Sequence, residues 1–313
     1  MRLFRKEGAF AAALFANDTL TLDALDEQHL IYRLSIKGLW RPKPVLYQAD
    51  PFLFVKDDTL YLFYELQHWD DPGVIAMVKT RDLTTWTEPV VVLRQPFHMS
   101  FPYVFEDEGV VYMVPESQES DAIHLFRADN EELTSFSKVR TLLNQERKDG
   151  IHYNLNDSHI YKKGGTIFLF TSYQKDWMYY QELYVTDDLL HGEFIKHPSS
   201  PICVSNEYGR NGGSLLHFDG RLLRVTQDCH QEYGDNVSLM EITRLSPTDY
   251  EERLFMRNLL PKNTIFREGG HQLNIARFKD KFIYAADYKQ NRWAWYKLWV
   301  SILVKLKLHK RKG

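Results

Sequence analysis

The sequence contains little cysteine. Only Cys203 and Cys229 occur among 313 residues, which is too few for a disulfide framework or a zinc site. We therefore expect a reducing, cytoplasmic location. Basic residues precede a short apolar run at the N-terminus, but Glu7 interrupts the basic part and no small-residue cleavage site follows, so we do not expect a signal peptide.

The short motifs that identify many enzymes are also missing from the sequence. No segment has the spacing of a phosphate loop, a dinucleotide fingerprint or a metal-binding cluster. We accordingly expect no cofactor, no metal ion and no nucleic-acid partner.

Acidic residues are absent from the C-terminal segment. From Gln290 onward there are seven Lys or Arg and no Asp or Glu, interleaved with aromatic and aliphatic residues. The apolar stretch is shorter than the about 20 residues that span a bilayer, but its composition suits an interfacial helix on anionic lipid. We predict a short amphipathic helix over residues 293–308 that holds the protein at the inner face of the membrane. The alternative is a terminal helix docked on the domain and followed by a frayed basic tail.

Apolar and aromatic residues are plentiful by contrast. They make up 44% and 14% of the chain, with 18 Tyr and 19 Phe, and aromatic residues favour half-buried strands. The composition predicts a soluble, globular and β-rich protein.

One pattern recurs five times along the chain. In each copy, two apolar runs flank a two-residue polar or glycine turn, as expected for a β-hairpin. The copies are residues 50–65, 101–116, 157–172, 212–227 and 272–287. Their turns lie 51, 56, 55 and 60 residues apart, close to the length of a four-stranded propeller blade.

The repeat predicts an all-β fold, a five-bladed β-propeller with four-stranded blades and a short basic C-terminal helix. We expect residues 41–290 to form the propeller, residues 1–40 to complete the ring because the fifth unit runs short of strands, and residues 291–313 to form the basic aromatic tail.

Superposing the five turns aligns two columns of residues. The first column lies before the turn and contains Asp50, Phe101, Asp157, Gly212 and Gln272. The second lies after it and contains Glu65, Glu116, Ser172, Gln227 and Asp287. Equivalent positions in successive blades converge on the axis of a propeller, so polar residues in these columns are candidates for one central cleft.

Asp50 and Asp157 occupy equivalent places two repeats apart. An Asp before Pro is often only a turn former, but two carboxylates across a funnel are what glycoside chemistry requires. We predict Asp50 and Asp157 as catalytic residues, with Glu116 from the second column as a further acid and Glu65 as a substrate-binding residue.

Further candidates for substrate binding lie near the same strand ends. Tyr103 offers an aromatic face for a sugar ring, and Arg210, before two glycines, can grip a carboxylate or phosphate. Gln227 and Asp228 close the fourth hairpin, and His271 opens the fifth. The alternatives are an ion pair between blades for Arg210, a structural network for Gln227 and Asp228, and a buried, satisfied histidine.

Several segments resemble the N-terminal domain of the plant glucosamine inositolphosphorylceramide transferases and its stand-alone bacterial relatives. They are residues 49–54 (ADPFLF), 61–65 (YLFYE), 100–106 (SFPYVFE), 112–117 (YMVPES), 224–229 (RVTQDC) and 233–234 (YG). The resemblance extends roughly from Trp40 to Tyr288. It implies a fold similar to the five-bladed arabinanase and xylosidase propellers, with Asp50 matching their general base and Asp157 their second aspartate.

One departure from those hydrolases affects the expected function. Where they carry a general-acid glutamate at the start of the fourth blade, this sequence reads Arg-Asn-Gly-Gly from Arg210. Glu116 or Glu65 would have to replace that acid, and inverting hydrolysis needs carboxyl groups about 6.5–9.5 Å apart.

Three functions therefore remain open. We expect a glycosyltransferase, or a component of one, in cell-surface glycan or glycolipid assembly, with Asp50 as base and a sugar, glycan or nucleotide sugar as substrate. The alternatives are a glycoside hydrolase with an atypical acid and a non-catalytic sugar-binding module.

Overall fold

The computed structural model describes residues 6–34, 45–68, 71–144, 154–293 and 302. The long segments of this part of the chain are β-strands, with one short 3₁₀ turn at Gln118–Ser120. Within the described ranges, no helix is long and apolar enough to cross a membrane. The amphipathic helix predicted over residues 293–308 lies almost entirely outside the described residues.

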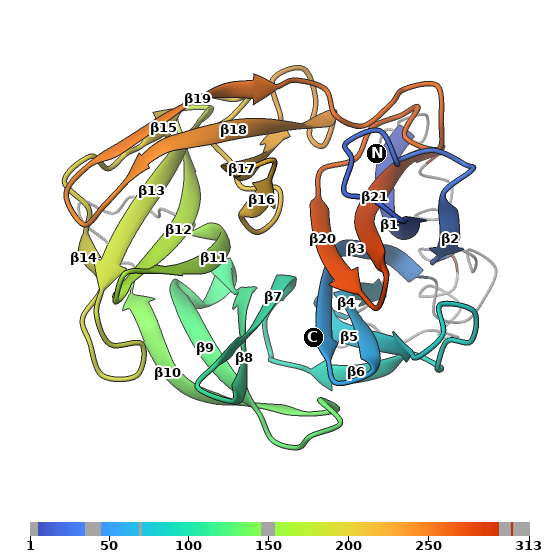
Figure 1. The fold of residues 1–313 in the computed structure, drawn as a ribbon, viewed down its shortest axis with the longest axis horizontal. Coiled ribbons are helices and arrows are strands. Elements are labelled where there is room, and N and C mark those ends of the chain that lie inside the picture. The colour runs from blue at the N-terminus through green and yellow to red at the C-terminus, as the bar shows by residue number, and fades with distance from the viewer. Residues whose placement is uncertain (1–5, 35–44, 69–70, 145–153, 294–301, 303–313) are drawn as a thin grey trace.

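The strands form four sheets that stand around a common centre (Figure 1). The largest sheet contains β20 (Leu273–Phe278), β21 (Lys281–Trp293), β1 (Lys6–Asn17), β2 (Leu30–Arg33), β3 (Val45–Lys56), β4 (Thr59–His68), β5 (Val74–Thr80) and β6 (Val90–Leu93). The second contains β7 (Ser100–Asp107), β8 (Val110–Glu116), β9 (Ala122–Ala128) and β10 (Phe136–Asn144). The third contains β11 (Asn156–Lys163), β12 (Thr166–Lys175), β13 (Met178–Thr186), β14 (Ile195–Lys196) and β15 (Cys203–Val204). The fourth contains β16 (Leu216–Phe218), β17 (Arg221–Asp228), β18 (Asn236–Leu245) and β19 (Tyr250–Met256).

Each of the five expected hairpins is present. They are β3–β4, β7–β8, β11–β12, β16–β17 and β20–β21, each with two residues between its strands. Both turn residues have positive φ at Glu108–Gly109, Gly164–Gly165 and Asp219–Gly220, the geometry that matches the twist of paired strands. The first strands of these hairpins face the centre of the ring (Figure 1).

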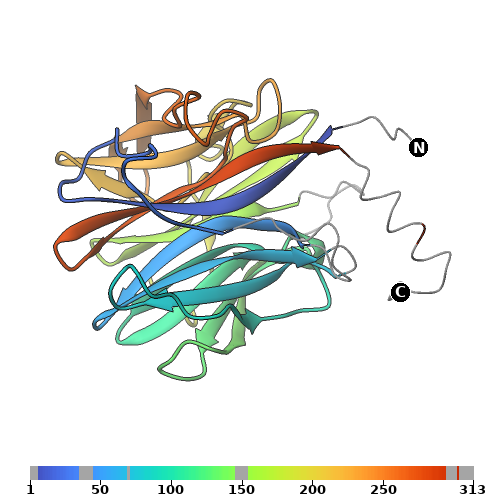
Figure 2. The ribbon, with the colours of Figure 1, turned by 90° about the vertical axis from the view of Figure 1, so that its right-hand side faces the viewer.

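The N-terminal strand β1 links the two ends of the repeat. It pairs antiparallel with β21 along its whole length, from Lys6 opposite Trp293 to Asn17 opposite Phe282, and a single parallel pair joins Ala11 to Gln48 in β3. Figure 2 shows β1 beside β21 at the edge of the ring. Residues from the start and end of the chain therefore share one sheet.

Apolar side chains between facing sheets form the core. Between the largest sheet and the second sheet, Phe63 and Met77 pack with Val104, Met113 and Phe126. Burial of such a side chain contributes about 1.5–3 kcal/mol. This packing fixes the orientation of neighbouring sheets and hence the place of residues at their inner strand ends.

Candidate active site

Three inner strands share an unusual backbone feature at the first aligned column. Asp50, Phe101 and Asp157 have φ values of 53°, 44° and 48°, and in each strand the pairing register shifts at this point. A bulge re-aims the side chain it carries, and positive φ costs about 1–3 kcal/mol at a residue other than glycine. The positive φ at these three residues therefore costs stability. The bulges in return set the direction in which the three side chains point.

Carboxylates at the axis accept hydrogen bonds from the bulged backbone. The N–H of Phe101 donates to Oδ2 of Asp50 at 3.1 Å, and the N–H of Asp157 donates to Oε2 of Glu116 at 3.1 Å. The N–H of Asp50 donates to Oδ2 of Asp287 at 3.3 Å. Each bond joins different inner hairpins, so the column residues hold one another in place.

These strand ends surround a cavity of about 730 Å³. Strand residues of the first three sheets contribute to its wall, and the fourth sheet contributes through the loop residues Glu232 and Tyr233. Its ionisable side chains include Asp50, Glu65, His98, Glu116, Arg210, Glu232, His271 and Lys289. The volume falls within the range of small-molecule sites, and the charged lining suits a polar ligand.

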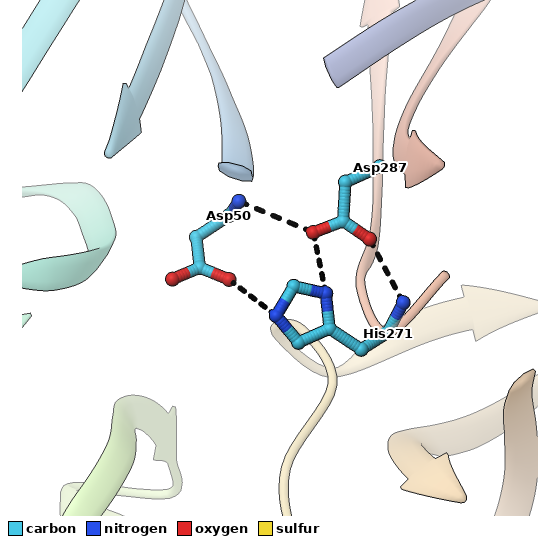
Figure 3. Close-up of side chains that lie close together, drawn as sticks. All are labelled: Asp50, His271 and Asp287. Carbon is cyan, nitrogen blue, oxygen red and sulfur yellow. Dashed lines mark hydrogen bonds and ion pairs between the residues drawn. The ribbon is translucent and has the colours of Figure 1, made fainter. Parts of the chain in front are cut away.

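Asp50, His271 and Asp287 form a buried triad at this cavity (Figure 3). His271 places Nε2 3.3 Å from Oδ1 of Asp50 and Nδ1 2.5 Å from Oδ2 of Asp287. The three residues are 5%, 3% and 0% exposed. The backbone N–H of His271 also donates to Oδ1 of Asp287 at 2.8 Å, which fixes the imidazole between the two carboxylates.

The triad has shifted acidities. Burial raises the pKa of Asp50 to about 6; the positive His271 opposes this shift, and the negative charge of Asp287 adds to it. Burial alone would lower the pKa of His271, but the charge and hydrogen bond of Asp287, together with Asp50, raise it above the usual 6.5. At neutral pH Asp50 is therefore mostly ionised, and the two neighbouring carboxylates favour the cationic form of His271.

Glu65 and Glu116 also have raised pKa values. Burial raises the pKa of both carboxyl groups well above 4.5. The charge of Asp50 adds to the shift at Glu65, and that of Asp157 adds to the shift at Glu116, where Arg210 opposes it. The site thus combines several carboxyl groups whose pKa values are shifted by burial and by one another, an arrangement typical of acid–base catalysis.

Arg210 forms the second charged group of the site. Its Nε contacts Oδ2 of Asp157, and its NH2 lies 3.8 Å from Oε2 of Glu116. The guanidinium also lies over the rings of Tyr179 and Tyr233, 5.5 and 5.1 Å from their centroids. The same oxygen of Asp157 accepts a bond from Nε2 of Gln227 at 3.0 Å. Arg210 consequently covers Asp157 on the cavity side.

Five of the predicted site residues line the cavity: Asp50, Glu65, Glu116, Arg210 and His271. Asp157 and Gln227 contact them from behind Arg210.

Tyr103 and Asp228 lie elsewhere. The hydroxyl of Tyr103 donates to the carbonyl of Ile160 at 2.6 Å, and its ring packs on Phe105. The carboxylate of Asp228 accepts the N–H of His230 at 2.9 Å in the loop after β17. Neither residue is among those that line the cavity: the side chain of Tyr103 packs toward β11, and Asp228 lies at the end of β17.

The cavity also contains residues that we did not predict. Phe10 reaches it from β1, Tyr233 and Glu232 from the loop between β17 and β18, and Lys289 from β21. Tyr233 could have been predicted from the sequence, because it occurs in one of the segments that resemble the plant transferases. Phe10 carries no such signal because β1 lies outside the aligned repeats.

The triad is also the group best placed to hold a cation. One ligand atom from each of Asp50, His271 and Asp287 lies within 4.8 Å of the others. In the described structure these atoms pair with one another, so a metal ion would have to replace the two ion-pair contacts of His271.

Solved structures with a similar fold are glycoside hydrolases. Zg3597, a family 117 glycoside hydrolase from Zobellia galactanivorans, has a TM-score of 0.54 at 14% identity and aligns over 77% of this chain and 84% of its own. The GH32 β-fructofuranosidase BmSUC1 of Bombyx mori has a TM-score of 0.55 at 14% identity, over 77% and 55% of the two chains. The GH43 protein BlXynB of Bacillus licheniformis reaches 0.53 at 16% identity, over 82% and 55%. These likenesses establish a propeller-like fold.

Sequence comparison identifies a different set of relatives. Glucosamine inositolphosphorylceramide transferase 1 of Arabidopsis thaliana is 33% identical over 223 residues, which are 67% of this chain and 27% of that protein. Its counterpart in Oryza sativa subsp. japonica is 33% identical over 220 residues, 67% of this chain and 28% of that protein. The chain thus matches little more than a quarter of each plant enzyme. The family model of the N-terminal part of glucosamine inositolphosphorylceramide transferase 1 matches residues 40–280, so this chain belongs to that family.

Proposed function

We propose that this protein is a glycosyltransferase, or the sugar-handling part of one, in the assembly of a cell-surface glycan or glycolipid. Its relatives are named as transferases, and a cavity rich in charged groups lies at the inner strand ends. A nucleotide sugar is the donor that we favour.

We further infer five four-stranded blades. The eight-stranded sheet contains two of the inner hairpins, β3–β4 and β20–β21, and a single residue pair between β1 and β3 joins its two halves. Division at this pair gives one blade of β20, β21, β1 and β2, which residues 1–40 help to build, and another of β3 to β6. With the remaining three sheets, residues 41–290 supply the rest of the ring.

Asp50 is the proposed general base. It takes the proton of an acceptor hydroxyl while that oxygen bonds to the anomeric carbon of the donor and the bond to the leaving group breaks. A pKa of about 6 leaves Asp50 ionised at neutral pH yet basic enough to accept a proton. Glu116, whose pKa is raised well above 4.5, is the proposed proton donor to the leaving oxygen, and Arg210 can balance negative charge that develops on that oxygen.

The observation that carries this proposal is the triad geometry. The buried carboxylate of Asp50 lines the cavity and is held by the N–H of Phe101 and by His271. Asp157, which has the same bulge, is instead covered by Arg210, so Asp50 is the aspartate of this column whose carboxylate lines the cavity.

Glycoside hydrolysis is the second candidate. Burial raises the pKa of Glu65 and of Glu116, which makes either a candidate acid beside Asp50, with water in the place of the acceptor. Binding without catalysis is the third candidate and requires only the shaped cavity.

Replacement of Asp50 distinguishes these candidates. Asp50→Asn should lower turnover by about 10²–10⁴ in a transfer assay with nucleotide sugars, because the proton acceptor is lost, while calorimetric binding of the sugar is retained. Asp57→Asn, at the exposed turn of the same hairpin, is the matched control. Release of free sugar without an acceptor would favour hydrolysis, and unchanged turnover of Asp50→Asn would exclude Asp50 as the base.

We also propose that the basic tail binds anionic lipid, which would place the cytoplasmic protein at the inner face of the membrane. This proposal rests on the sequence of residues 291–313, most of which lie outside the described residues.

A further inference from the structure

Lys289 is a buried cation in the cavity. The proposed reaction gives this lysine no role. It extends from β21 and is 5% exposed. Its Nζ donates to the carbonyl of Tyr233 at 2.8 Å and lies 2.9 Å from Oε2 of Glu232. Removing a lysine ammonium from water is costly unless it is paired, so this position needs an anion.

Gly8 of the neighbouring strand β1 leaves room beside this side chain. A Cβ atom at position 8 would lie 2.8 Å from Cε of Lys289, so the flexible end of the lysine would have to move. Glycine at position 8 thus lets Lys289 lie along β1 in the observed conformation.

The anion that pairs with Lys289 is weakly held. Glu232 is 53% exposed at its side chain and lies in the loop between β17 and β18. Ion pairs of exposed side chains contribute little to stability. Arg210 differs, because it pairs with Asp157, which is 2% exposed. A ligand anion can thus replace Glu232 far more easily than it can replace Asp157.

Lys289 lies close to the triad of Asp50, His271 and Asp287. The ring of Phe10 lies 4.3 Å from the ring of His271, and Nζ of Lys289 lies 6.0 Å from the centroid of Phe10. One aromatic ring thus separates the triad from the lysine. Tyr233, which is 43% exposed and 5.1 Å from the ring of His271, offers a face for a sugar above them.

We propose that Lys289 binds a phosphate group carried by the sugar substrate and that this phosphate displaces Glu232. The inference rests on the proposed function, since it assigns a substrate class to the same cavity. A tethered carboxylate competes at an effective concentration on the order of millimolar. A phosphate with two negative charges overcomes this competition better than a single sugar carboxylate does.

Titration calorimetry with glucose, glucose 1-phosphate, glucuronate and inorganic phosphate tests the proposal. Hydrogen bonds to charged groups contribute about 1.5–3 kcal/mol, so glucose 1-phosphate should bind about 10–100-fold more tightly than glucose. Lys289→Met should abolish this difference, so that the variant binds glucose 1-phosphate no more tightly than glucose. Lys262→Met, which removes a lysine paired with Asp235 outside the cavity, is the matched control.

Glu232→Gln should have the opposite effect to Lys289→Met on the binding of glucose 1-phosphate. This second variant also tests the phosphate site if Lys289→Met fails to fold. Without the competing carboxylate, glucose 1-phosphate should bind more tightly than to the wild type, whereas glucose should not. Equal binding of glucose and glucose 1-phosphate would overturn the phosphate site but leave the sugar site intact. Failure of all sugars to bind would count against the proposed function itself.

Two further ligands distinguish the sources of the phosphate. Lys289-dependent binding of UDP-glucose would assign it to a soluble donor. Lys289-dependent binding to phosphatidylcholine vesicles that contain phosphatidylinositol would assign it to a lipid headgroup. The proposal would be overturned if the binding of UDP-glucose, of the phosphatidylinositol vesicles and of glucose 1-phosphate were all independent of Lys289.

Discussion

Nε2 of His271 lies 3.3 Å from Oδ1 of Asp50, although 221 residues separate the two in sequence. On its other side the same imidazole contacts Asp287. A cation between two buried carboxylates lowers the cost of ionising both. The pKa of Asp50 is thus raised chiefly by burial and is further modified by two residues distant in sequence, His271 and Asp287.

The first prediction concerns the pH dependence of activity. Asp50 must be ionised to accept a proton, and its pKa lies at about 6. We expect kcat/KM to rise as the pH increases through about 6 and to level off above it. A rate profile measured in buffers of constant ionic strength between pH 4.5 and 8 tests this. An activity that falls across the same interval would assign Asp50 the role of an acid.

Removal of the cation from the triad should shift this profile. In His271→Gln, the carboxylates of Asp50 and Asp287 lose the positive charge between them. Loss of an adjacent opposite charge raises a carboxyl pKa by about 1–3 units, so the rising limb should move to higher pH. His217→Gln, at an exposed position, serves as control. A lower plateau with an unmoved limb would show that His271 does not tune Asp50.

Arg210 should stabilise the fold by neutralising Asp157. Arg210→Met leaves the buried carboxylate without its cation, and breaking a buried pair in this way costs about 3–5 kcal/mol. We expect a corresponding loss in urea unfolding. The double variant Arg210→Met/Asp157→Asn should recover much of it, since no charge remains buried. Additive losses in the double variant would show that the two residues do not interact.

The buried side chain of His159 should make the free energy of unfolding decrease in acid. It is fully buried, both ring nitrogens lack a hydrogen-bond partner among the described residues, and its ring stacks on Phe170. Burial lowers the pKa of His159 from 6.5 to about 3. The unfolded chain therefore binds a proton that the native state does not, and stability falls as the pH drops from 6.5 toward 3.

His159→Phe should remove this loss. The variant should be at least as stable as the wild type at pH 7 and more stable by about 3 kcal/mol at pH 4. Urea unfolding at both pH values provides the measurement, with the exposed His191→Phe as control. An equal pH dependence in wild type and variant would contradict the argument.

The basic tail leads to the last prediction. Each Lys or Arg near an anionic surface contributes about 1 kcal/mol, so full-length protein should co-sediment with phosphatidylserine vesicles. A version truncated after Trp293 keeps β21 whole and should bind less. Equal sedimentation of both would end the proposal for residues 294–313.

The sequence by itself determined the hairpins and their order. Two-residue turns between apolar runs are local signals, and their regular spacing predicted five inner hairpins that the structure contains. The aligned columns also brought Asp50, Glu65 and Glu116 to one cavity, because equivalent strand positions reach equivalent heights around an axis.

Tertiary structure alone decided which side chains face the cavity. The bulge at Phe101 directs Tyr103 into the packing between sheets, where its hydroxyl bonds to Ile160. A register shift of one residue reverses the face of every following side chain, and sequence alternation does not reveal it. Phe10 and Lys289 meet because β1 pairs with β21 across the two ends of the chain, a long-range contact that no local pattern encodes.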